Sequence, residues 1–157
     1  MIAEVARLLK ENKDKLPFCL YVTNSVQEEI GLRGAEMITN TLKPNIAIVT
    51  DVTHDTSTPM IDAKKQGDVK IGKGPVISYA PAVQNNLREK IISLAEKNKI
   101  PFQRAASSRY TGTDTDAFAY SNGGVPSALI SLPLRYMHTT VEICLLYTSD
   151  AADDCEG

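Results

Sequence analysis

A continuous apolar run at residues 45–50, Asn-Ile-Ala-Ile-Val-Thr, is the feature that most constrains the fold of this chain. Its apolar residues follow one another instead of alternating with polar ones, which indicates a strand buried on both faces of a sheet. A second run of this kind covers residues 127–132. Because such strands need helices on both faces of their sheet, the sequence favours an α/β fold.

The segments around these runs carry helical and strand-like patterns. In the helix expected at residues 84–98, Leu87, Ile91, Leu94 and Ala95 would face inward. The other expected helices are residues 1–13, 31–42 and about 113–121, and the other expected strands are residues 16–22, 76–79 and 101–106. Strands that alternate with helices predict a three-layer α/β sandwich with a mostly parallel central sheet.

Composition excludes several classes of protein. The chain has 157 residues, enough for one domain with its own core, and a formal charge of −2 gives no reason to expect nucleic acid or an anionic membrane as partner. No apolar stretch approaches the roughly 20 residues that span a bilayer. The three cysteines, Cys19, Cys144 and Cys155, form no C-x-x-C pair. We therefore expect a reducing, cytoplasmic setting without thiolate zinc sites or disulfides.

Two adjacent carboxylates, Glu28 and Glu29, follow the apolar run at residues 18–22. Side chains delivered to the carboxyl end of a strand lie where open α/β sheets keep their active sites. Neighbouring carboxylates can divide the work, since one can hold a metal while the other moves a proton. With Asp51 and His138 they provide the ligand types of a hydrolytic zinc-type site.

Each of these residues also has a simpler interpretation. Taken alone, Glu28 and Glu29 could be a solvated surface pair, Asp51 could cap a turn, and His138 could be an ordinary hydrogen-bonded loop histidine. His54 follows Asp51 by three residues and could be mistaken for its metal partner. The residues alone leave these alternatives open.

Five short blocks occur in a fixed order. They are VQEEIGLRGA at residues 26–35, AIVTDVTH at 47–54, GKGP at 72–75, GTD at 112–114 and PLRYMH at 133–138. Together, over about residues 1–142, they resemble the C-terminal half of the two-metal aminopeptidases of the glutamyl and tetrahedral (TET) aminopeptidase type. This is metallopeptidase family forty-two of clan MH, in which some members carry an old endoglucanase label.

The resemblance implies a role for each residue of the acidic and histidine set. Glu28 matches the general base, Glu29 a metal ligand, Asp51 a ligand of the other metal, and His138 the histidine that shares an ion with Glu29. His54 matches no ligand. The implied cofactors are two divalent metal ions, zinc or cobalt, which activate a water whose proton Glu28 takes.

Three further residues are candidates for substrate binding. Two interpretations stay open for each: Thr113 and Asp114 line the substrate cleft or cap a helix, and Arg135 orients substrate or pairs with a carboxylate. The resemblance also implies a peptide substrate and a homo-oligomer, whereas the sequence leaves open which N-terminal residue is preferred.

Two ligands of the family, an upstream histidine and a bridging aspartate, have no counterpart in this chain. We therefore expect residues 1–142 to be the C-terminal part of a catalytic aminopeptidase domain that is inactive alone. Residues 143–157 resemble the in-frame translation of a transposase-type sequencing adapter, so we expect a non-native tail; the alternative is a natural acidic tail.

Other functions fit parts of the pattern. A zinc-dependent deacylase or carboxypeptidase of the same clan would share the carboxylate pair but would need a cationic clamp for a substrate carboxylate. An endoglucanase would use two separated carboxylates without metals. A binding module could retain the fold without chemistry, although the joint presence of four site residues argues against it.

Overall fold

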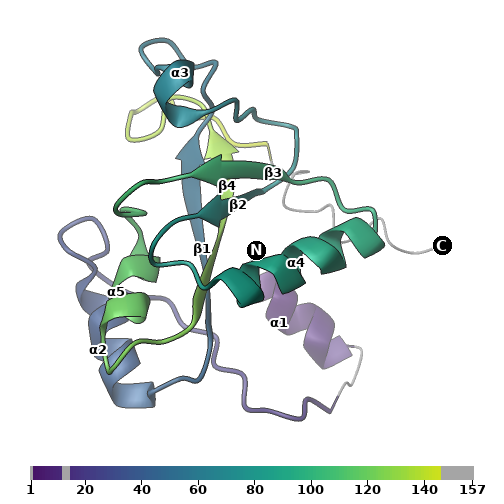
Figure 1. Cartoon of the computed structure of the whole chain (residues 1–157), viewed down its shortest axis with the longest axis vertical. Coiled ribbons are helices and arrows are strands. Elements are labelled where there is room, and N and C mark those ends of the chain that lie inside the picture. The colour runs from purple at the N-terminus through teal and green to yellow at the C-terminus, as the bar shows by residue number, and fades with distance from the viewer. Residues whose placement is uncertain (1, 12–14, 146–157) are drawn as a thin grey trace.

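The computed structural model describes residues 2–11 and 15–145 of the chain. Its helices are α1 (Ile2–Glu11), α2 (Arg33–Leu42), α3 (Ala63–Gln66), α4 (Asn85–Lys97) and α5 (Asp114–Tyr120). Its strands are β1 (Ala47–His54), β2 (Val76–Tyr79), β3 (Gln103–Ala106) and β4 (Ser127–Leu134). The alternation of strands and helices confirms the predicted α/β class (Figure 1).

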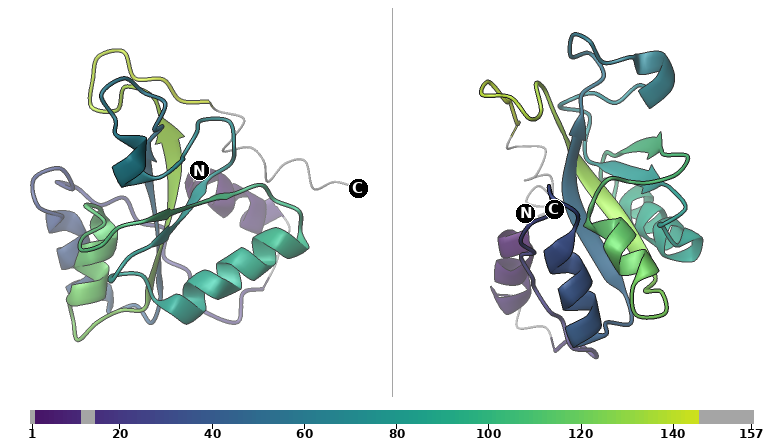
Figure 2. Two further views of the ribbon diagram at one scale, coloured as in Figure 1. Left: turned by 45° about the horizontal axis from the view of Figure 1, so that its top comes forward. Right: turned by 90° about the vertical axis from the view of Figure 1, so that its left-hand side faces the viewer.

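The four strands form one mixed sheet in the order β1-β4-β2-β3. β1 runs parallel to β4, with Ala47 opposite Ser127 and His54 opposite Leu134, and β2 runs parallel to β3. Only the short β2–β4 pairing is antiparallel among the described ladders. Helices α1 and α4 lie on opposite sides of this sheet (Figures 1 and 2), so the predicted layers and the mostly parallel sheet are confirmed.

The core lies where the two continuous apolar runs meet α2 and α5. Val49 of β1 and Leu129 of β4 are buried together with Ala35 of α2 and Phe118 of α5. Burial of one Leu or Phe side chain stabilises a fold by about 1.5–3 kcal/mol, so this cluster anchors the sheet to both helices.

Helix α4 packs largely with the expected face, but one of the four predicted inward residues lies outside it. Ile92 and Ala95 are buried, whereas Leu94 is 60% exposed, so the inward position predicted for Leu94 is wrong. Successive helical residues are turned by about 100°, which places Leu94 on the opposite side from Ile92. With 13 residues α4 is the longest described helix, and none of the described helices is long and apolar enough to cross a membrane.

The strand predicted at residues 16–22 is absent from the described structure. These residues form no strand and bend at residues 17 and 18, and Phe18 and Tyr21 remain 62% and 61% exposed. An apolar run forms a strand only where another strand satisfies its backbone groups, and β1 takes part in a described ladder with β4 alone. The acidic pair is therefore delivered by a segment without regular secondary structure and not by a strand.

Candidate active site

The turn that carries Glu28 and Glu29 is tied to the start of α2. The Glu28 carbonyl accepts hydrogen bonds from the amides of Gly31 and Leu32 at 3.1 and 3.0 Å, and Gly34 N–H donates to Val26 O at 2.9 Å. A Cβ on Gly34 would lie 2.4 Å from the Val26 nitrogen, so only glycine allows this approach. The glycines that follow the acidic pair thus shape the turn that presents it.

Glu29 meets His138 across the molecule. The His138 ring Nε2 lies 3.1 Å from Glu29 Oε1, although the residues are 109 positions apart in sequence. Both side chains are exposed, at 62% for His138 and 72% for Glu29. The structure therefore brings together the two residues for which the sequence predicts a shared metal ion.

His138 sits in a turn that follows β4. Its φ is 63° and that of Tyr136 is 55°, so both backbones adopt the left-handed conformation that residues with a Cβ seldom take. The His138 amide donates to Glu142 Oε2 at 3.2 Å, which helps to hold the turn. Because β1 and β4 are parallel, this turn and the end of β1 lie at the same edge of the sheet.

Asp51 occupies β1, three residues before the strand ends at His54. The strand therefore extends beyond the run expected at residues 45–50, because its pairing with β4 continues as far as Leu134. Asp51 is half-buried and its Oδ1 accepts a hydrogen bond from Val52 N–H at 2.7 Å.

The local charges act on two of these carboxyl groups. Burial raises the pKa of Glu28, and the negative charges of Asp51, Asp114 and Glu29 raise it further, with His138 opposing them. Burial also raises the pKa of Asp51 despite the hydrogen bond from its neighbour's amide, and Asp114 and Glu29 add to the effect. Carboxylates that repel one another in this way are a favourable environment for a cation.

These residues line one cavity of about 700 Å³. Glu28, Glu29, Asp51 and His138 all border it, as does His54 at the end of β1. Residues 105–113, which connect β3 to α5, form another part of its wall. Most of this wall was missed by sequence reasoning, although a connection that leaves a strand towards a helix is a common position for site residues.

The predicted substrate-binding residues fall in different places. Thr113 lines the cavity, and its hydroxyl accepts a hydrogen bond from Thr115 N–H at 3.2 Å as the cap of α5. Asp114 is 9% exposed and does not line the cavity; its Oδ2 accepts a hydrogen bond from Ser25 Oγ. Arg135 also lies outside the lining, and its charge helps to lower the pKa of Asp55.

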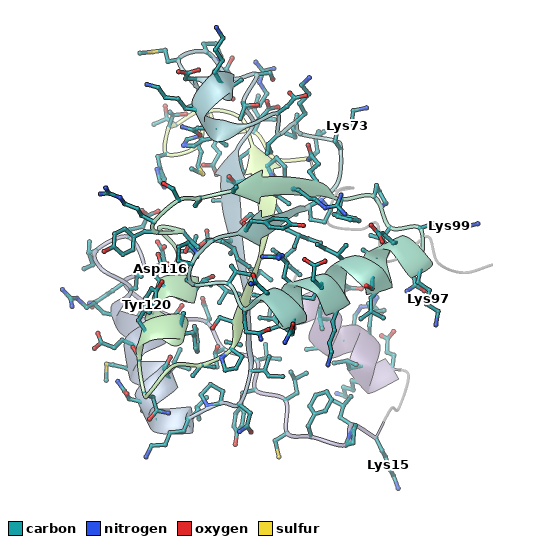
Figure 3. All side chains as sticks on the ribbon, in the orientation of Figure 1. Lys15, Lys73, Lys97, Lys99, Asp116 and Tyr120 are labelled. Atoms are coloured by element: carbon teal, nitrogen blue, oxygen red, sulfur yellow. The ribbon has the colours of Figure 1, made fainter. Side chains whose placement is uncertain are left out.

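The wall beside α5 is fixed by a second carboxylate. Asp116, labelled on α5 in Figure 3, accepts hydrogen bonds from the amides of Thr111 and Gly112, each at 3.0 Å to Oδ2. Asp116 is buried and its charge is satisfied by these donors. It therefore shapes the cavity wall without entering the cavity.

Comparisons with known proteins show which proteins this chain resembles. The family model described as M42 glutamyl aminopeptidase matches residues 1–154. The lysyl aminopeptidase of Pyrococcus furiosus is 38% identical over 145 residues, which cover 89% of this chain and 38% of that protein. The glutamyl aminopeptidase of Lactococcus lactis is 28% identical over 146 residues, covering 88% of this chain and 38% of that protein.

Solved structures agree with these relatives. A TET aminopeptidase from a marine-sediment Thaumarchaeota archaeon superimposes with a TM-score of 0.85 at 29% identity, covering 98% of this chain and 43% of that one. A protein described as a putative peptidase/endoglucanase superimposes with a TM-score of 0.73 at 36% identity. That match covers 98% of this chain and 45% of the other protein's chain. This chain thus spans less than half the length of these relatives, and it belongs to the M42 glutamyl aminopeptidase family.

Proposed function

We propose that this chain forms the C-terminal part of a metal-dependent aminopeptidase that hydrolyses N-terminal residues from peptides. The observation that carries the proposal is the 3.1 Å contact between Glu29 and His138 at the cavity that Glu28 and Asp51 also line. Family membership and relatives named aminopeptidases support the same activity.

The donor groups fit a divalent metal in kind. Carboxylates and an imidazole are the ligands that zinc and cobalt accept, and Asp114 Oδ1 is buried without a described hydrogen-bond partner, which leaves local negative charge uncompensated. The ligands are too few, because within residues 2–11 and 15–145 no three His, Cys, Asp or Glu side chains are grouped closely enough to hold an ion. Glu29 and His138 would share one ion and Asp51 would bind the other.

The chain's own groups then have distinct tasks. Two divalent ions, when bound, would lower the pKa of a water molecule and polarise the scissile carbonyl. Glu28, half-buried at the cavity, would take the proton of the attacking water and return it to the leaving amine. Thr113 borders the same cavity and is the best supported of the three proposed substrate contacts.

The incomplete ligand set leads us to propose that this chain is inactive by itself. A chimera tests the function: residues 1–142 replace the matching stretch of the Pyrococcus furiosus lysyl aminopeptidase. We expect chelator-sensitive hydrolysis of aminoacyl-anilides that Glu28→Gln lowers by at least about 100-fold, as loss of a general base does. Glu89→Gln, on α4 away from the cavity, is the matched control.

Other substrates separate the alternatives in the same assay. Hydrolysis of N-acyl amino acids would favour the deacylase, and chelator-resistant cleavage of cellulose would favour the endoglucanase. A chimera that folds, binds metal and cleaves no aminoacyl-anilide would contradict the aminopeptidase proposal.

The assembly of the whole protein is a further part of the proposal. One similar structure is described as a dodecamer, and another as assembling into a tetrahedron or a large octahedral shell. We expect the full-length protein to form a homo-oligomer, which light scattering would measure. The cytoplasmic location, the identity of the metals and the non-native origin of residues 143–157 stay predictions, and residues 146–157 of that tail lie outside the described residues.

A further inference from the structure

The segment that presents the acidic pair has little packing of its own. Residues 15–25 form no helix or strand, and Leu20 and Val22 are 48% and 49% exposed. A segment without buried apolar contacts is free to move unless specific hydrogen bonds hold it. The position of Glu28 and Glu29 therefore depends on the few bonds that tie this segment to the rest of the fold.

One of these bonds comes from a side chain 89 positions further along the chain. Ser25 Oγ donates a hydrogen bond to Asp114 Oδ2, three residues before the acidic pair begins. Among the described residues, the backbone bonds of this turn reach only into the start of α2, as between Gly34 N–H and Val26 O. Ser25 and Asp114 thus form the described side-chain hydrogen bond that joins the turn to α5.

Asp114 is held in place by its position on a packed helix, so it can fix this hydrogen bond. It is the first residue of α5, directly after the capping Thr113, and it is 9% exposed. Helix α5 in turn packs against α2, β1 and β4 and contributes Phe118 to the core. A group fixed on such an element can hold a mobile segment in one position.

A direct substrate contact fits Asp114 less well. Thr113 lines the cavity, whereas Asp114 does not. One carboxylate oxygen accepts from Ser25, and the other is buried without a described partner. The side chain is therefore enclosed beneath the site.

We propose that Asp114 is a positioning residue, which through Ser25 holds the turn of Glu28 and Glu29 so that Glu29 meets His138. The role of the positioned groups rests on the proposed aminopeptidase function. The positioning itself rests on the Ser25–Asp114 contact and on the enclosure of Asp114.

Amide hydrogen exchange of the chain itself tests the positioning without any metal. The reporters are Gly31 and Leu32, whose amides donate to the Glu28 carbonyl. We expect Ser25→Ala to speed their exchange by about five- to tenfold, the effect of losing one hydrogen bond. Ser25→Thr keeps the hydroxyl and should restore slow exchange, and Asp114→Asn keeps an acceptor oxygen and should do the same.

Titration with Co²⁺ alone tests the consequence for the site. Ser25→Ala should weaken Co²⁺ binding by about three- to tenfold with Ser25→Thr within twofold of the parent, since each metal ligand must be held in place. Ser93→Ala, an exposed serine on α4, is the control for both measurements. Thermal unfolding of each variant shows whether the fold is retained.

The outcomes separate the two proposals. Unchanged exchange in Ser25→Ala, or failure of Ser25→Thr to restore it, overturns the positioning role. Faster exchange in Ser25→Ala supports the positioning whether or not the parent chain binds Co²⁺. Absence of Co²⁺ binding by the chimera with the Pyrococcus furiosus lysyl aminopeptidase would count against the metal site.

Discussion

The N-terminal segment, residues 2–11 and 15–32, and the region of the sheet both contribute residues to the same cavity, but they are built differently. The sheet region buries Val49, Phe118 and Leu129 in one cluster, whereas α1 has no buried residue and the segment after it leaves Phe18 62% exposed. The acidic pair comes from the poorly packed region and His138 from the turn after β4. The comparison teaches that a site can be assembled between a rigid scaffold and a segment held by only a few hydrogen bonds.

Truncation of one leucine in each region is the strongest test of this contrast. Leu129 is 4% exposed in the core cluster, and Leu129→Ala should lower the free energy of unfolding by about 2–5 kcal/mol. Leu20 is 48% exposed, and Leu20→Ala should change it by less than about 0.5 kcal/mol. Urea unfolding followed by circular dichroism measures both, and equal losses would break the comparison.

The junction between the regions should be sensitive to a single methyl group. Gly34→Ala places a Cβ 2.4 Å from the Val26 nitrogen and 2.6 Å from its carbonyl oxygen, so the turn must move away from α2. We expect a loss of about 1–3 kcal/mol in the free energy of unfolding, typical of overpacking. Gly67→Ala is a control for the methyl group, because no atom lies within 4 Å of its Cβ position, although its φ of 90° adds strain there. Urea unfolding showing no loss in Gly34→Ala would contradict the close approach.

A buried carboxylate should make the loop after β1 more stable than the N-terminal segment. Burial alone would raise the pKa of Asp55, but hydrogen bonds from Ser57 and Ile71 and the charge of Arg135 outweigh it and lower the pKa. The ionised Asp55 should therefore stabilise the fold above its unfolded pKa of about 3.9, and this contribution is lost as pH falls through the lower folded value.

The variant Asp55→Asn checks this sign. At pH 7 it should lose about 1–2 kcal/mol in the free energy of unfolding, since hydrogen bonds to the charged group are lost. Its difference from the parent chain should shrink as the pH falls below about 4. A difference that stays constant between pH 7 and pH 3 would show that the charge of Asp55 does not stabilise the loop.

The contact that joins the two regions at the site should matter least for stability. Glu29 and His138 are 72% and 62% exposed, so water screens their interaction. Glu29→Gln should change the free energy of unfolding by less than about 1 kcal/mol, as exposed pairs do, while it weakens Co²⁺ binding to the chain. A large loss of stability with unchanged Co²⁺ binding would assign the pair a structural role instead.

The same contrast explains which parts of the fold could be predicted from the sequence. The continuous apolar runs of β1 and β4 and the Thr113 cap of α5 were predictable, because local composition and capping chemistry specify them. The strand at residues 16–22 was predicted wrongly, since an apolar run does not reveal whether a partner strand exists. The antiparallel pairing of β2 with β4 could not be predicted either, because it depends on residues far apart in the sequence and no local pattern encodes it.

The candidate site divides in the same way. The five sequence blocks identified Glu28, Glu29, Asp51 and His138, all of which border the cavity. The part that Asp114 plays through Ser25 could not be read from sequence, because the two residues are 89 positions apart and meet only in the folded chain.

The backbone of His138 has a consequence for how this protein could be stabilised. Its φ of 63° suits glycine, which lacks the Cβ that makes this conformation costly for other residues. Replacement by glycine would relieve that strain while deleting the imidazole that faces Glu29. Selection of variants of this chain for heat resistance alone would therefore favour substitutions that remove a residue of the proposed site.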